Sequence, residues 1–166
     1  MSQAKQQTQA AQSYISAVQA LVDQSLSYVK QQCLNEAGRL SGSRLDEYQV
    51  VSYELAYCSA ELSAAKFVAK YAQEHRDQKG EQDALYLEEQ FSLHFAAEAI
   101  RNCETRLSAR PAEFGLERSQ LSPVFSNTEM LAFCDAYLSS AAMADLGKFM
   151  LEQNGRLGDY QLDEDK

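Results

Sequence analysis

The sequence predicts an all-α protein, an antiparallel bundle of four long helices with a short irregular or helical connection between the third and the fourth. Two observations predict this class. Apart from Gly147, every glycine and proline falls in one of four breaks, at 38–42, 80, 111–123 and 155–158, which leaves four helix-length segments. Serine, alanine, glutamine and glutamate, which are poor strand formers, dominate those segments together with leucine.

The first helix is expected over residues 3–37, because apolar residues recur there at spacings of three and four. They form a single stripe that faces one core: Ile15, Val18, Val22, Leu26, Val29 and Cys33. The second helix is expected over residues 44–79. Ser43 can cap its amino-terminal amides, and Gly80 can supply the left-handed residue that ends it.

The second helix is apolar around most of its circumference, so we expect it to touch at least two neighbours. One stripe comprises Leu45, Tyr48, Leu55, Leu62, Ala65 and Ala72, and Val51, Cys58 and Val68 broaden it. The alanines at 56, 60 and 64 put small side chains on a common face. We interpret them as a site of close packing inside the bundle rather than as a dimer motif.

The third helix is expected over residues 82–109, with Pro111 enforcing its end. The apolar residues between Ala112 and Phe125 are expected to cover one end of the bundle. The fourth helix is expected to start after Ser126, which makes a capping box with Glu129, and to run to Gly155. Residues 1–155 therefore form one predicted bundle domain, and residues 156–166 an acidic tail or the start of a linker.

No residue pattern encodes a chemistry, so we predict no catalytic, cofactor-binding or metal-binding residue. The di-iron bundle motif Glu-x-x-His, the G-x-S-x-G elbow, glycine-rich phosphate loops and C-x-x-C pairs are all missing from the sequence. His94 and Glu98 lie one helical turn apart and could form a hydrogen-bonded pair, which we interpret as structural or surface rather than as a ligand or acid/base pair. Arg101, Arg106 and Arg110 suit the negative end of the third helix.

Charge and composition restrict the partners. The net charge of −9 disfavours nucleic acid and anionic membranes, and no stretch of 18 apolar residues predicts a membrane span. The four cysteines are expected to be buried free thiols in a soluble, cytoplasmic protein. Five of the nine tyrosines cluster on the second and third helices, where core and interface roles are both expected: Tyr48, Tyr53, Tyr57, Tyr71 and Tyr86.

Part of the sequence resembles a known family. The segment from Leu45 to Ala56, then Ala60-Glu61-Leu62, and further on the segment from Phe95 to Ile100, are similar to the amino-terminal helical extension of some acyl-CoA dehydrogenases. The methylsuccinyl-CoA dehydrogenase type is the nearest. The closing segment from Leu157 to Asp165 resembles the junction that leads into the flavoprotein core of such enzymes.

The resemblance implies a non-catalytic accessory domain that packs on a dehydrogenase core or on another subunit. In that family the flavin site, the acyl-CoA site and the catalytic carboxylate belong to the core, so FAD is expected only if such a core is attached or partnered. Two other functions stay open. One is an independent helical interaction or scaffold protein that forms homo-oligomers, and the other is a binder of small molecules or acyl chains between the second and third helices.

Overall fold

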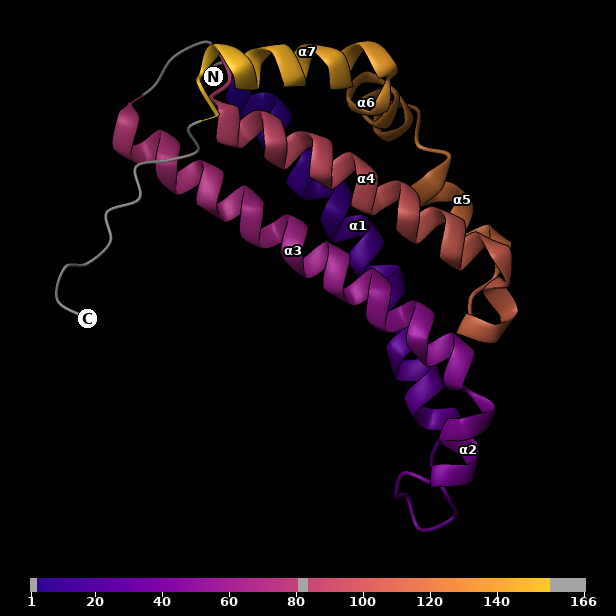
Figure 1. Ribbon diagram of the computed structural model, residues 1–166. Coiled ribbons are helices and arrows are strands. Elements are labelled where there is room, and N and C mark those ends of the chain that lie inside the picture. The colour runs from indigo at the N-terminus through magenta and orange to yellow at the C-terminus, as the bar shows by residue number, and fades with distance from the viewer. Residues whose placement is uncertain (1–2, 81–83, 156–166) are drawn as a thin grey trace, which may run out of the picture.

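The computed structural model describes residues 3–80 and 84–155, and over that part of the chain the protein is all-α without strands (Figure 1). Three long helices pack side by side: α1 (Gln3–Gln32), α3 (Gln49–Lys79) and α4 (Leu87–Ala109). The shorter elements are α2 (Gly42–Glu47), the 3-10 helix η1 (Pro111–Phe114), α5 (Arg118–Phe125), α6 (Thr128–Leu138) and α7 (Ser140–Glu152). The predicted segment 156–166 lies outside the described residues.

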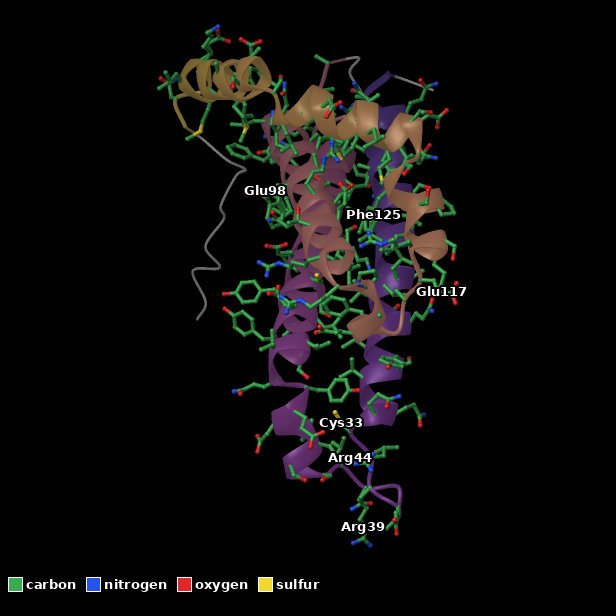
Figure 2. The ribbon with its side chains drawn as sticks, turned by 90° about the vertical axis from the view of Figure 1, so that its right-hand side faces the viewer. Cys33, Arg39, Arg44, Glu98, Glu117 and Phe125 are labelled. Carbon is green, nitrogen blue, oxygen red and sulfur yellow. The ribbon has the colours of Figure 1, made fainter. Side chains whose placement is uncertain are left out.

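The first helix is shorter than predicted, because α1 ends at Gln32 rather than at residue 37. The Asn35 side-chain oxygen accepts hydrogen bonds from the backbone amides of Ala37 and Arg39, both at 3.0 Å. Such local side-chain bonds compete with the helical ladder. Arg44 closes the loop by donating to the Gln32 carbonyl at 3.2 Å, at the end of the molecule where Figure 2 shows Cys33 and Arg44.

The second predicted helix is interrupted at Tyr48, which separates α2 from α3 with φ −97° and ψ 13°. The predicted cap Ser43 lies inside α2, and the N-cap residue of α2 is Ser41, whose side chain makes no capping hydrogen bond. The other end is confirmed. Gly80 has φ +100°, and its amide donates to the Arg76 carbonyl at 2.9 Å where α3 stops.

The third predicted helix begins later than residue 82, at Leu87, and ends at Ala109 as predicted. Tyr86 stands at the amino-terminal cap of α4, and its backbone amide donates to the Glu89 carboxylate at 2.9 Å. This is the reciprocal arrangement of a capping box, with a buried glutamate in place of a solvated one.

The predicted fourth long helix is two helices, α6 and α7, so the bundle of four long helices is wrong in this respect. Ser139 adopts an extended conformation, and its hydroxyl accepts from the Ala142 amide at 3.1 Å, which starts α7 as a separate helix. α7 runs across the end of the bundle in both views (Figures 1 and 2). The cap of α6 is Asn127, which accepts from the Met130 amide at 2.9 Å, and not the predicted Ser126.

The core lies between α1, α3 and α4, and α6 covers α4. All four cysteines are buried and free, as predicted. Phe114, Leu121 and Phe125 are buried between η1, α5 and the long helices, which confirms that the segment after α4 covers apolar surface (Figure 2). Leu26, predicted on the core stripe of α1, is exposed. None of the described helices holds an apolar stretch long enough to cross a membrane.

Candidate protein-binding face on helix α3

A continuous row of apolar residues lies exposed along one face of α3. Val50, Tyr53 and Phe67 keep 56%, 57% and 73% of their surface in contact with solvent. The row, here called the outer stripe, alternates spacings of three and four residues over six intervals: Val50, Tyr53, Tyr57, Ala60, Ala64, Phe67 and Tyr71. This is the heptad spacing of a helix seam that packs against another helix.

α3 therefore carries two apolar faces, and the bundle buries only one of them. Leu55, Cys58, Leu62 and Ala65 are buried against α1 and α4, so the prediction that this helix touches two neighbours is confirmed. Figure 1 shows α3 along one edge of the molecule, with α1 and α4 on the same side of it. The prediction that the alanines at 56, 60 and 64 pack inside the bundle is wrong, because all three are exposed.

Neighbouring charges hold the tyrosines of the outer stripe in place. Arg106 of α4 is ion-paired with Glu54 of α3, and its guanidinium lies 4.7 Å from the centre of the Tyr57 ring. The Tyr57 ring lies 4.8 Å from that of Tyr53. A hydrogen bond with Tyr57 raises the pKa of Tyr53 above its usual value. A binding face with ordered aromatic side chains loses less entropy when it binds.

The buried polar cluster at the α3–α4 turn has a structural role. Arg76 and Glu89 form a two-pronged ion pair in which both nitrogen–oxygen distances are 2.5 Å. His75 lies 3.4 Å from the Glu88 carboxylate and packs edge-on against Tyr86. The pair joins α3 to α4, and removing either partner would leave a buried charge uncompensated. Sequence patterns did not identify this cluster, because a buried charged residue on a long helix cannot be distinguished from a solvent-exposed one by its spacing.

The histidine pair considered from the sequence does not form. His94 Nδ1 lies 2.8 Å from the Gln90 carbonyl, its ring packs edge-on to Tyr137, and Glu98 is exposed. His94 Nε2 is buried and has no hydrogen-bond partner among the described residues. The ring therefore serves packing between α4 and α6.

The three arginines of α4 do more than complement its helix end. Arg101 bonds Glu104 at 2.7 Å and Asp135 of α6 at 3.2 Å. Arg106 and Arg110 face Glu54 of α3. They join α4 to its neighbours and leave no cluster of unpaired cations for an anionic ligand.

Two hollows border α3 in the described part of the chain, and binding of a small molecule or acyl chain between the helices stays a prediction. The hollow between α3 and α4 has a volume of 340 Å³, and Glu54, Asn102, Arg106 and Arg110 are among the residues that line it, with apolar atoms supplying most of its surface. A groove of 490 Å³ between α1 and α3 is bordered by glutamines, lysines and a glutamate together with Ile15 and Ala69, and most of its surface is apolar. Over residues 3–80 and 84–155 no group of histidine, cysteine, aspartate or glutamate side chains is arranged to hold a metal ion.

The buried thiols should be unreactive in the native protein. Burial raises the pKa of Cys134 to about 11. The hydrogen bond between Cys58 and Cys103 raises the pKa of Cys103 and lowers that of Cys58, so Cys58 is protected from reagents by its burial alone. We expect no fast-reacting thiol with Ellman's reagent at about pH 8, and four after unfolding in guanidinium. Because an unfolded thiol ionises near pH 8.5, Cys134 should also lower stability as the pH rises from about 8.5 to 11. One fast thiol in the folded protein would contradict this burial.

No family model matches the chain, and no curated protein matches its sequence.

Proposed function

We propose that this chain is a non-catalytic helical module that binds another protein through the outer stripe of α3. One observation carries the proposal, the row of exposed apolar residues at heptad spacing that the bundle leaves uncovered. The largest exposed apolar patch of a protein is often functional, and patches of this kind mark interaction sites. The chain acts in the cytoplasm in this proposal, and its partner is protein rather than nucleic acid or membrane.

The partner class follows in part from the sequence. The resemblance to the helical extension of acyl-CoA dehydrogenases makes a dehydrogenase core or subunit one candidate occupant of the outer stripe. In this form of the proposal the module positions or stabilises a flavoenzyme, and FAD binds to the partner alone. The stripe supports it because Val50 and Tyr53 belong both to the exposed face and to the segment that carries the resemblance.

A second candidate is an independent scaffold that binds copies of itself. It is favoured by the central alanines of the outer stripe, Ala60 and Ala64, which allow a second helix to approach closely. In this form no flavoenzyme is required.

Site-specific photo-crosslinking in the cells that make the protein tests the binding face. A benzoylphenylalanine that replaces Phe67, which is 73% exposed, should give a covalent adduct with a discrete protein on irradiation. The same residue in place of Ala17, exposed on α1, is the matched control and should give none. Mass spectrometry of the adduct then identifies a dehydrogenase, this chain itself or another protein.

Failure to obtain an adduct specific to position 67 would count against the binding face altogether. The purified chain should show no flavin absorbance, and stoichiometric flavin would contradict the non-catalytic part of the proposal.

A further inference from the structure

We infer that the occupant of the outer stripe is a second copy of this chain, packed antiparallel through α3 around a two-fold axis between Ala60 and Ala64. The inference rests on the proposed function and names the partner of the same face. Its evidence is the order of residue sizes along the stripe, the area that the stripe offers and the charge at its end.

The order of side-chain sizes along the outer stripe is the same in both directions from its midpoint. From its midpoint it runs through a small residue and then two aromatic ones on each side: Ala60, Tyr57 and Tyr53 toward the amino terminus, and Ala64, Phe67 and Tyr71 toward the carboxyl terminus. An antiparallel pair related by a two-fold axis puts residue i of one copy opposite residue 124 − i of the other. It therefore pairs small with small and aromatic with aromatic, which is the self-complementarity that a two-fold interface requires.

The position of the small residues matches the geometry of two crossing helices. Helices that cross at about 20° are closest at the crossing point and diverge on either side of it. Ala60 and Ala64 allow close approach at the centre. The aromatic side chains fill the widening gap toward the ends, where Tyr57 meets the partner's Phe67 and Tyr53 meets the partner's Tyr71.

The area corresponds to a weak dimer. Tyr53, Tyr57, Phe67 and Tyr71 are between 41% and 73% exposed. At about 150–250 Å² per aromatic side chain they offer roughly 400–500 Å² from each copy, so a symmetric pair with its alanines and Val50 buries about 1,000 Å². This value lies at the lower limit for a specific interface, and it corresponds to a dimer that exchanges with its monomer.

Charge favours the antiparallel direction. Glu74 continues the heptad spacing three residues after Tyr71, is exposed, and lies 3.6 Å from Lys70 Nζ of the same helix in a solvent-exposed ion pair. In a parallel pair it would face the same carboxylate of the partner across the seam, which is repulsive. In the antiparallel pair it falls opposite Val50, and the two helix dipoles oppose each other.

Sedimentation equilibrium of the full chain tests the dimer. At about 100 µM the wild type should sediment with twice the 18.6 kDa mass of one chain, and Ala64→Glu should raise the dissociation constant at least about 10-fold, because a charge at the crossing must be desolvated. Glutamate is a good helix former, so the helicity of the variant should match that of the wild type. Ala17→Glu on α1 is the same change at an exposed helical alanine and should leave dimerisation unchanged.

Phe67→Lys provides a second variant at the most exposed aromatic position and should weaken the dimer to a similar degree. A monomeric wild type at this concentration, or a dimer that survives both Ala64→Glu and Phe67→Lys, would overturn the inference. If the wild type is monomeric while the crosslinker at position 67 captures a different protein, the proposed binding face stands and only the second copy fails.

The direction of the pair is tested by a spin label at Gln78→Cys, an exposed position near the end of α3, since the native cysteines are buried. In the antiparallel pair residue 78 lies opposite residue 46 of the partner. At a helical rise of about 1.5 Å per residue, the two labels should therefore be separated by about 50 Å. Labels within about 20 Å would show a parallel pair and overturn the antiparallel assignment.

Discussion

Replacing Arg76 with methionine should lower the free energy of unfolding by about 3–5 kcal/mol, the cost of leaving a buried charge without its partner. Arg76 and Glu89 are 3% and 1% exposed, and they meet through two bonds of 2.5 Å. The guanidinium also donates to the Ala84 carbonyl at 3.1 Å. Without it, the Glu89 carboxylate stays buried with one remaining bond, from the Tyr86 amide. Urea unfolding followed by helicity, at one fixed protein concentration, measures the loss.

Two further variants distinguish this cost from a general effect of removing charge. Lys148→Met removes an ion pair with Asp145 in which both side chains are more than 70% exposed, and it should change stability by no more than about 0.5 kcal/mol. The double variant Arg76→Met, Glu89→Met removes both buried charges and should recover most of the loss. An Arg76→Met protein that loses less than about 1 kcal/mol would show that Glu89 finds water or another partner.

The second large effect is expected at Gly115, where alanine should cost about 2–4 kcal/mol. Gly115 has φ +67°, a left-handed conformation that costs an ordinary residue about 1 kcal/mol or more. A Cβ atom there would lie 2.2 Å from Cγ of Tyr28 and within 2.6 Å of both Cδ atoms. The ring cannot stay in place, so the η1–α1 contact has to open or shift, at a further cost of about 1–3 kcal/mol. Thermal and urea unfolding both measure it.

Gly38→Ala is the matched control, because Gly38 has a similar φ of +70° but no atom within 4 Å of the position of a Cβ. It should show the conformational cost alone. Equal losses at the two positions would mean that Tyr28 moves aside freely, contrary to the close contact described above. Gly147→Ala, in the open helical stretch of α7, should instead stabilise the protein by about 1 kcal/mol.

Much of the helical structure could be predicted from local patterns. The ends of α3 at Gly80 and of α4 at Ala109 agree with the sequence, because a glycine with positive φ and a proline act through the backbone of their own neighbours. The errors fall where a side chain competes with the helix. Asn35 ends α1 early and Ser139 divides the last helix in two, and in each case one short polar side chain satisfies backbone amides that a continuous helix would have used.

The candidate site was only partly predictable. The sequence showed that the second predicted helix is apolar on more than one face, and it singled out the tyrosines and the alanine run. It did not show which apolar face is left uncovered. Residues 51, 55, 58, 62 and 65 and residues 50, 53, 57, 60, 64 and 67 follow the same alternation of three and four, so periodicity assigns both to a seam. For this reason the alanines at 56, 60 and 64 were predicted to be internal, whereas they are exposed.

The sequence by itself determined the helical class, the burial of the four cysteines and the absence of a known catalytic motif, since these depend on composition, spacing and residue type. Only the tertiary structure decided that α1 and α4 both lie on one side of α3, that Arg76 and Glu89 meet in the interior, and that the outer stripe remains exposed. The physical reason is that α1 and α4 bury the face of α3 that carries Leu55, Cys58 and Leu62, and no described helix covers the other. The stripe that the bundle cannot bury is the surface through which we expect this protein to act.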